Sequence, residues 1–146
     1  MAAMTDYLEN KLIDQLFRAQ AYTFPTTLHI GLLTAAPADG TAGTEVAGGS
    51  YARVAVASSL ANWAGTQAAA STVASSGTSG TTSNNATITF PAPTAAWGVA
   101  SHWGIYDAAS AGNLLFYGAL GASKTINNGD AAPSFAAAAL TLQIDN

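Results

Sequence analysis

The side chains of this 146-residue chain that suit acid–base or metal chemistry are two histidines and eight carboxylates. His29 and His102 each stand at an outward position of an alternating segment, where a polar side chain is the usual choice, and no HExxH spacing surrounds either of them. The chain has no cysteine, so disulfides and thiolate-bound metals are excluded. We therefore predict no metal ion and no cofactor.

The eight carboxylates are scattered along the chain, and each has a simpler explanation than catalysis. A glycosidase would need two of them about 5–10 Å apart in a cleft, which their spacing in the sequence alone does not exclude. No GxSxG nucleophile motif and no phosphate-binding P-loop is present. We predict that the chain is not an enzyme. The carboxylates are Asp6, Glu9 and Asp14 in a helix, Asp39, Asp107 and Asp130 in turns, Asp145 near the end of the chain, and Glu45.

Aromatic side chains are the remaining candidates for a binding surface. Trp103 lies in the middle of an alternating segment, so we expect it in the core. Trp63 and Trp97 lie in or beside loops, where they suit either a small local core or a contact between subunits. Tyr51 follows a glycine-rich loop. We take Trp63, Trp97 and Tyr51 as the predicted interface residues, whereas an exposed aromatic face would suit a carbohydrate ligand.

One helix is expected, at residues 5–19. Its large apolar side chains recur at helical spacing and form one stripe, while acidic residues occupy its first turn. Thr5 suits the N-cap position. We expect a surface helix packed on a sheet through this stripe, and a helix that docks a partner is the alternative. The stripe consists of Leu8, Leu12, Ile13, Leu16 and Phe17.

Beyond the helix the apolar period changes from 3.6 to 2, which is typical of strands. Short strands separated by turn residues favour a mainly β fold, an antiparallel β-sandwich or jelly-roll-like fold with one N-terminal α-helix. In the last strand we expect Leu140, Leu142 and Ile144 to face inward. The Asn-Gly pair within residues 127–130 predicts a hairpin. The strands are expected at residues 26–34, 51–58, 86–90, 99–107, 114–120 and 135–145.

The chain is expected to form a single domain, residues 1–146, with the helix at 5–19 and the sandwich at 26–145. Within it, residues 59–83 are almost entirely Ala, Ser, Thr and Gly, and we predict a low-complexity insertion there. We expect this insertion to be an extended loop held at Trp63. Two weak strands of small residues are the alternative.

Charge excludes some partners. Only 8% of the residues are charged, and four basic residues in a chain of net charge −4 cannot neutralise a nucleic-acid backbone. No apolar run approaches the roughly 20 residues of a membrane span, and charges interrupt any signal-peptide core. We therefore predict no nucleic-acid partner and no membrane partner.

Several phrases of the sequence, in order, resemble a family of small tailed-bacteriophage virion structural proteins whose members are often labelled phage tail fibre proteins. The resemblance covers most of the chain except residues 59–83, which are longer and richer in Ala and Ser than the family pattern. The phrases are YLENKLIDQLFRAQAY at residues 7–22, TTLHIGLLTAAP at 26–37, GTEVAGGSYARVAV at 43–56, ITFPAPTAAWG at 88–98, HWGIYDAASAGNLLFYGAL at 102–120 and KTINNGD at 124–130.

The resemblance implies a non-enzymatic structural protein located in the virion and made in the host bacterial cytoplasm. Because the chain has no fibre-like repeat or heptad pattern, we favour a capsid decoration (cement) protein. It would bind the major capsid protein from outside as a homo-oligomer, with a trimer favoured, and stabilise the shell. The alternative is a tail-associated protein, in a fibre, spike or tip, that contacts other tail proteins and has a host-glycan-binding role. The N-terminal helix and residues 37–49 are the candidate anchoring surfaces.

Overall fold

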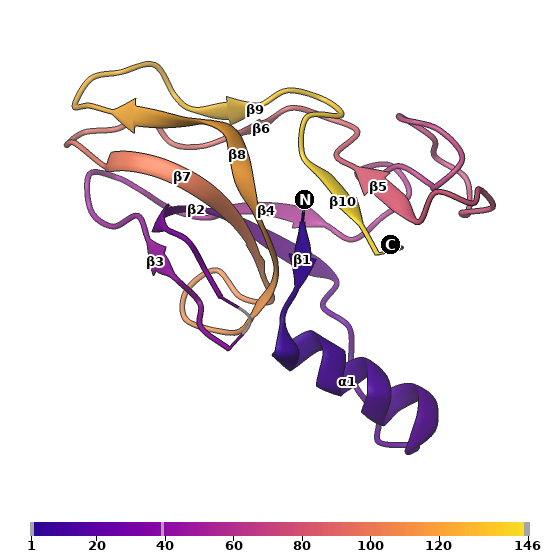
Figure 1. Ribbon diagram of the computed structural model, residues 1–146. Coiled ribbons are helices and arrows are strands. Elements are labelled where there is room, and N and C mark those ends of the chain that lie inside the picture. Colours follow the sequence, from indigo (N-terminus) through magenta and orange to yellow (C-terminus); the bar gives the residue numbers. More distant parts are fainter. Residues whose placement is uncertain (1, 39, 145–146) are drawn as a thin grey trace.

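The computed structural model describes residues 2–38 and 40–144 (Figure 1). It is mainly β with one helix near the N-terminus, which confirms the predicted fold class. The elements are β1 (Ala3–Met4), α1 (Asp6–Phe17), β2 (Thr27–Ala35), β3 (Thr44–Glu45), β4 (Val54–Ala57), β5 (Thr81–Ser83), β6 (Ile88–Thr89), β7 (Gly98–Tyr106), β8 (Leu114–Ile126), β9 (Ser134–Phe135) and β10 (Thr141–Gln143).

The largest sheet has six strands, and all its pairings are antiparallel. Its order is β1-β8-β7-β2-β3, and β4 shares the outer edge of β2 with β3. Two short ribbons, β6–β9 and β5–β10, complete the described sheets, and in Figure 1 they lie at the upper end and at the side of the large sheet. The long strands β2, β7 and β8 therefore form the platform on which the other elements rest.

The hydrophobic core lies between this platform and the two ribbons. Alternate residues of β2 and β7 supply one side, and residues from the ribbons or next to them supply the other, as the two-residue period requires. Trp103 is 6% exposed and belongs to this core, as expected. The central members are Ile30, Leu32, Trp103 and Ile105 from the platform and Ile88, Phe90, Leu140 and Leu142 from the opposite layer.

The last predicted strand, residues 135–145, is interrupted. The chain forms β9, makes a turn in which Ala138 has a φ of +62°, and then forms β10. Leu140 and Leu142 are buried as predicted, but Ile144 is 65% exposed, so its inward assignment is wrong. The Ile144 N–H still donates to the Gly80 carbonyl at 3.0 Å, but Ile144 lies beyond the last residue pair of the β5–β10 ribbon, Gln143 with Thr81, and its side chain is left uncovered.

The predicted hairpin at residues 127–130 is a turn but does not join paired strands. Gly129 has a φ of +79°, and the Asp130 carboxylate accepts a hydrogen bond of 2.7 Å from the Asn127 backbone N–H. β8 runs on to Ile126, past the predicted end at residue 120, and the turn leads it to β9, which pairs with β6. Turn chemistry is local, whereas the choice of pairing partner depends on the rest of the sheet.

The predicted packing of the whole helical stripe on a sheet is wrong. Leu8 is 5% exposed, but Ile13, Leu16 and Phe17 are 50%, 71% and 81% exposed. The Thr5 hydroxyl donates to the Leu114 carbonyl at 2.7 Å, so it fastens the first turn to β8 and makes no side-chain cap. α1 then extends away from the sandwich, as Figure 1 shows at the lower right.

The segment at residues 59–83 ends in β5, which pairs with β10. Trp63 is half-buried against the core and forms an isolated bridge with Asn84, and the Ala64 N–H donates to the Ser83 carbonyl at 2.8 Å. Asn84 is 1% exposed and its side chain bonds the backbone of Ala86, Ala136 and Leu140. The assignment of residues 1–146 to one domain stays a prediction.

A glycine allows the largest core side chain to lie against β8. Gly118 faces Trp103 across the β7–β8 pair, and a Cβ placed on Gly118 would lie 2.5 Å from Cζ2 of the indole. Gly121 lies three residues further along the same strand, and a Cβ there would meet nothing within 4 Å. Substituting each glycine by alanine therefore separates the effect of close packing on stability from the general effect of replacing a glycine in a strand.

We expect Gly118→Ala to lower the free energy of unfolding by about 1–3 kcal/mol, because the added methyl group overpacks the Trp103 ring. Gly121→Ala, the matched control, should leave it unchanged or raise it by less than about 1 kcal/mol. Urea denaturation monitored by tryptophan fluorescence measures both. Equal effects of the two substitutions would contradict the close-packing explanation.

Candidate functional site

Two of the three predicted interface residues lie together in the core. The Tyr51 and Trp97 rings meet edge to face at 5.2 Å, and Tyr51 stacks on Phe90 at 6.3 Å. Trp97 is 5% exposed, and its indole N–H donates to the Gly49 carbonyl at 2.9 Å. Trp63 packs against the core separately. The geometry thus assigns Trp97 to packing within the chain, and the interface role of Trp63, Trp97 and Tyr51 stays a prediction.

Arg53 and Glu45 form a partly buried ion pair beside these rings, in which the Glu45 side chain is 26% exposed. The Arg53 side chain is 6% exposed, and its Nε and Nη2 donate to the two Glu45 carboxylate oxygens at 2.8 and 2.7 Å. Its Nη1 donates to the carbonyls of Ala108 and Ala111 in the β7–β8 loop. The guanidinium carbon lies 3.4 Å from the centre of the Tyr106 ring. One side chain therefore joins the start of β4, β3 and the β7–β8 hairpin.

The tyrosines of this cluster are held in the neutral form. Burial, with the Glu45 charge adding to it, raises the pKa of Tyr106 to about 12 although the Arg53 charge opposes this. The pKa of Tyr51 is raised further, mainly by burial. The Tyr51 hydroxyl donates to Glu45 at 2.9 Å and accepts from the Leu32 N–H at 2.8 Å. The Arg53 guanidinium, the Glu45 carboxylate and the Tyr51 hydroxyl are all engaged within the chain, so the cluster is suited to structural support rather than to chemistry.

Among the described residues, which do not include Asp39 and Asp145, the histidines and the other carboxylates do not converge on a site. His29 pairs with Tyr106 and His102 with Leu33, so the histidines lie four residues apart along the β2–β7 ladder. The Asp107 carboxylate accepts two hydrogen bonds of 2.7 Å from Asn113 and closes the hairpin loop. Within residues 2–38 and 40–144, no group of three or more His, Asp or Glu side chains is arranged to hold a metal ion. Over the same residues, no helix has the length and apolar character needed to cross a bilayer.

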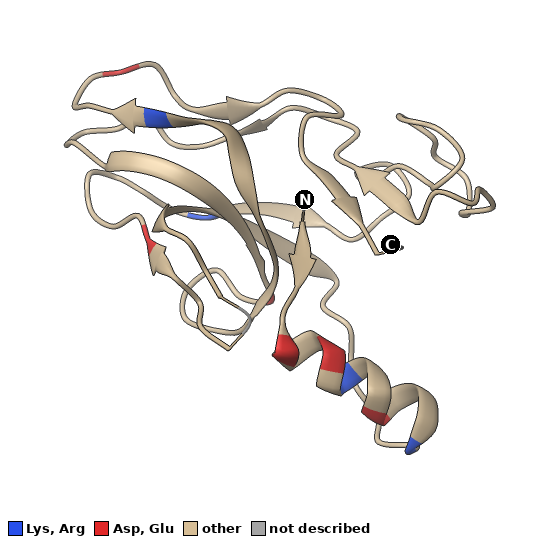
Figure 2. Cartoon of the chain, viewed as in Figure 1, with Lys and Arg blue, Asp and Glu red and all other residues tan. Residues whose placement is uncertain are grey.

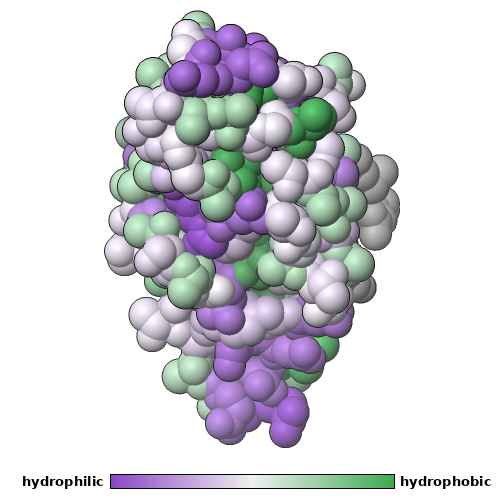
Figure 3. Space-filling view, turned by 90° about the vertical axis from the view of Figure 1, so that its left-hand side faces the viewer, coloured by the Kyte–Doolittle hydropathy of each residue, from purple (hydrophilic) through white to green (hydrophobic). Residues whose placement is uncertain are grey.

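The first surface feature without a partner is the α1 arm, by which we mean α1 and the following residues 18–24. Its exposed apolar side chains are Ile13, Leu16, Phe17 and, at 53% exposure, Phe24. The Tyr22 N–H donates to the Gln15 side chain at 2.6 Å, so the chain turns back along the helix. The arm also carries much of the charge of the molecule (Figure 2), and in Figure 3 hydrophilic and hydrophobic residues lie side by side at this lower end.

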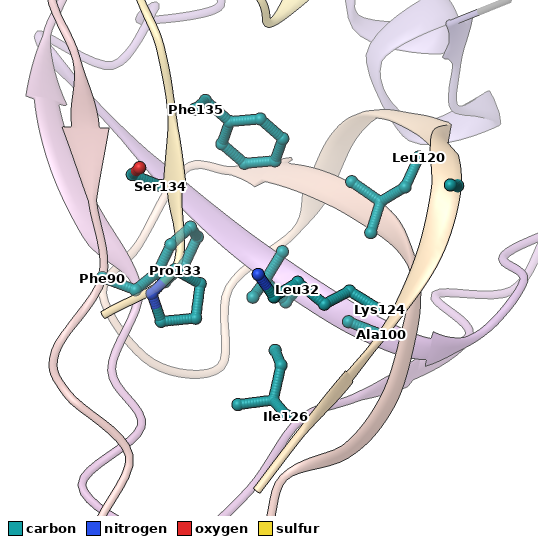
Figure 4. A pocket seen from close by; sticks show the side chains of 10 residues that line it. Leu32, Phe90, Ala100, Leu120, Lys124, Ile126, Pro133, Ser134 and Phe135 are labelled. Atoms are coloured by element: carbon teal, nitrogen blue, oxygen red, sulfur yellow. The ribbon is translucent and has the colours of Figure 1, made fainter. Parts of the chain in front are cut away.

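The second feature is an apolar cavity of about 150 Å³ at the other end of the sandwich, which we call the β8–β9 pocket. Lys124 extends from β8 across this pocket toward Phe90 and Pro133 (Figure 4). Among the described residues, no carboxylate lies within ion-pair distance of its ammonium group. The lining residues are Leu32, Phe90, Ala100, Leu120, Ala122, Lys124, Ile126, Pro133, Ser134 and Phe135.

Sequence reasoning missed three of these features. The pairing of Arg53 with Glu45 was not predicted, although two opposite charges at the ends of a loop in a charge-poor chain are a usable signal. The anchoring role of Asn84 had no signal beyond its place in a polar run. The β8–β9 pocket had none, because it is formed by five separate stretches of the chain.

The polar groups around Arg53 support the fold of this β-rich chain. The surface features that have no partner within the described chain are an apolar arm and an apolar pocket. Such features are typical of a protein that works by contact with other proteins. The family model described as Podophage GP4 fiber I protein gp80 matches residues 3–143, and the chain belongs to this family of phage structural fibre proteins. The match confirms the resemblance to phage virion proteins. It supports a non-enzymatic structural component of the virion that associates with other virion proteins. A search of curated proteins found no match.

We expect Arg53→Lys to lower the free energy of unfolding by about 2–4 kcal/mol, because a lysine cannot hold both Glu45 oxygens and two loop carbonyls at once. Arg18→Lys is the matched control: Arg18 forms an exposed ion pair with Asp14 at 3.1 Å. It should change the free energy of unfolding by less than about 0.5 kcal/mol. Urea titration of the two variants measures both changes. Similarly small changes in the free energy of unfolding would show that the contacts of Arg53 contribute little to stability.

Stability should fall as the pH rises above about 10. The unfolded tyrosines then lose protons, whereas Tyr106, whose pKa is about 12, and Tyr51 keep theirs in the folded chain. Each such tyrosine contributes a slope of about 1.4 kcal/mol per pH unit in this range. Tyr106→Phe keeps the ring on Arg53 and should make the slope shallower by that amount. Urea midpoints measured from about pH 9 to 12 test this, and an unchanged slope would contradict it.

Proposed function

We propose that this protein is a subunit of the tail fibre apparatus of its phage and that it works by contact with other subunits. The observation that carries the proposal is the match of residues 3–143 to a family described as fibre proteins. The projecting α1 arm supports it, because four large apolar side chains that are half or more exposed favour association with another protein surface. A homo-oligomer, with a trimer favoured, belongs to this proposal.

The alternative placement, a decoration protein on the capsid, has its own support in the structure. The described chain is a short sandwich without repeats, and such a unit suits a knob bound at many equivalent sites. We give the fibre priority because the family description names a fibre and a fibre can also be assembled from compact subunits. A host-glycan-binding role stays a prediction, for which the exposed Phe24 ring and the half-buried Tyr22 ring, 4.9 Å apart on the arm, are candidates.

In either placement the chain would act as a rigid body that presents apolar surface. The ion pair of Arg53 with Glu45 holds the edge of the sheet, and the hydrogen bonds of Asp107 to Asn113 close the β7–β8 hairpin loop. Because these segments are already ordered, binding would cost little conformational entropy. Burial of apolar surface is worth about 25 cal/mol per Å², and the exposed face of α1 is where such burial remains available.

Immunogold labelling of purified particles with antibodies against this chain, followed by cryo-electron microscopy, tests the proposal. We expect gold at the tail fibres. Label spread over the capsid would overturn the fibre placement in favour of decoration, and particles free of label would overturn a virion role. Antibodies first absorbed with the purified chain are the control, since they should label neither structure.

A further inference from the structure

We propose that copies of this chain associate head to tail: the phenyl ring of Phe17 in one copy occupies the β8–β9 pocket of the next, and the Asp14 carboxylate meets Lys124. This contact deepens the proposed function, since it is the kind of contact from which a fibre can be built. Its occupant is therefore a second copy of the chain, presented through the α1 arm.

Size and chemistry match between the ring and the pocket. The cavity of about 150 Å³ is lined mainly by apolar side chains, among them Leu32, Leu120 and Phe135. An apolar protein cavity of about this volume is known to accept benzene, the core of a phenylalanine side chain. Phe17 is 81% exposed, more than any other large apolar side chain among the described residues. Its burial in a neighbour would remove the most unfavourable exposed surface of the chain.

The two partners lie at opposite ends of the molecule. In Figure 1 the α1 arm extends below the sandwich, whereas β9 and the adjoining end of β8 lie at the top. A chain therefore cannot fill its own pocket with its own Phe17. A contact between different patches of two copies leaves one free arm and one free pocket, so association continues into a ring or a filament.

Complementary charges orient the α1 arm of one copy on the pocket of the next. Lys124 is the one basic residue of the sandwich besides the paired Arg53, and it has no carboxylate partner within the described residues. Asp14 precedes Phe17 by three residues, and side chains at that spacing are neighbours on a helix surface. The side chains of Asp14 and Arg18 are 32% and 68% exposed, so replacing their ion pair by a pair with another residue costs little free energy. Asp14 can therefore bind Lys124 of the next copy while Phe17 enters the pocket.

Sedimentation velocity of the full chain across a concentration series tests the proposal through two single substitutions. Phe17→Ser removes the occupant, and Lys124→Glu puts a carboxylate opposite Asp14. We expect the unmodified chain to associate, and each substitution alone to weaken that association at least about tenfold. Val73→Ser replaces another exposed apolar residue, 60% exposed, in a segment that contributes to neither surface, and it should leave association unchanged.

Mixing the two variants separates this contact from other modes of association. The Phe17→Ser chain keeps an intact pocket and the Lys124→Glu chain keeps an intact arm, so the mixture should form a dimer with one copy of each and no larger species. A symmetric helix-to-helix contact would instead survive Lys124→Glu. Survival of association in that variant, failure of the mixture to form the dimer, or an unmodified chain that is monomeric up to millimolar concentration would each overturn the proposal. Any of these results, combined with gold labelling at the fibres, would leave the proposed function standing.

Discussion

The pairing of the buried Arg53 side chain with Glu45 is the interaction on which the arrangement of this sandwich depends. It joins the start of β4 to β3, and through the carbonyls of Ala108 and Ala111 it holds the β7–β8 hairpin against both. A buried guanidinium is tolerable only when its donors are satisfied, and here four contacts and the Tyr106 face meet that condition. The hairpin carbonyls that Arg53 binds lie 55 and 58 residues away from it in the chain.

Small residues are the second constraint. In a chain with few charges and many alanines and glycines, large rings can pack only where the facing backbone leaves room, as Gly118 does for Trp103. The sandwich thereby encloses most of its aromatic side chains. The charges that remain outside the Arg53 cluster lie largely on the α1 arm, on Lys124 and in loops, and they mark the parts of the molecule that are free to meet a partner.

A structural protein of a virion acts through surfaces rather than through a reacting centre. The side chains of Arg53, Glu45 and Asp107 are engaged in hydrogen bonds within the chain and support the fold, and the two histidines lie four residues apart along the β2–β7 ladder. The α1 arm is fastened only at its base, by Leu8 and by the Thr5 hydroxyl, so its outer turns keep an apolar face that the fold itself does not use. The association proposed for this chain would cover this face.

By itself the sequence determined what depends on short stretches of chain: the helix, the alternation that produces the strands, the inward faces of Leu140 and Leu142, the turn chemistry at residues 127–130 and the phrases that mark the family. Only the tertiary structure decided which strands pair, that Arg53 turns inward, that Ile144 and most of the helical stripe are exposed, and that the β8–β9 pocket exists. The reason is physical. Periodicity reports which side chains share a face, but whether that face is covered depends on elements that arrive from distant parts of the chain.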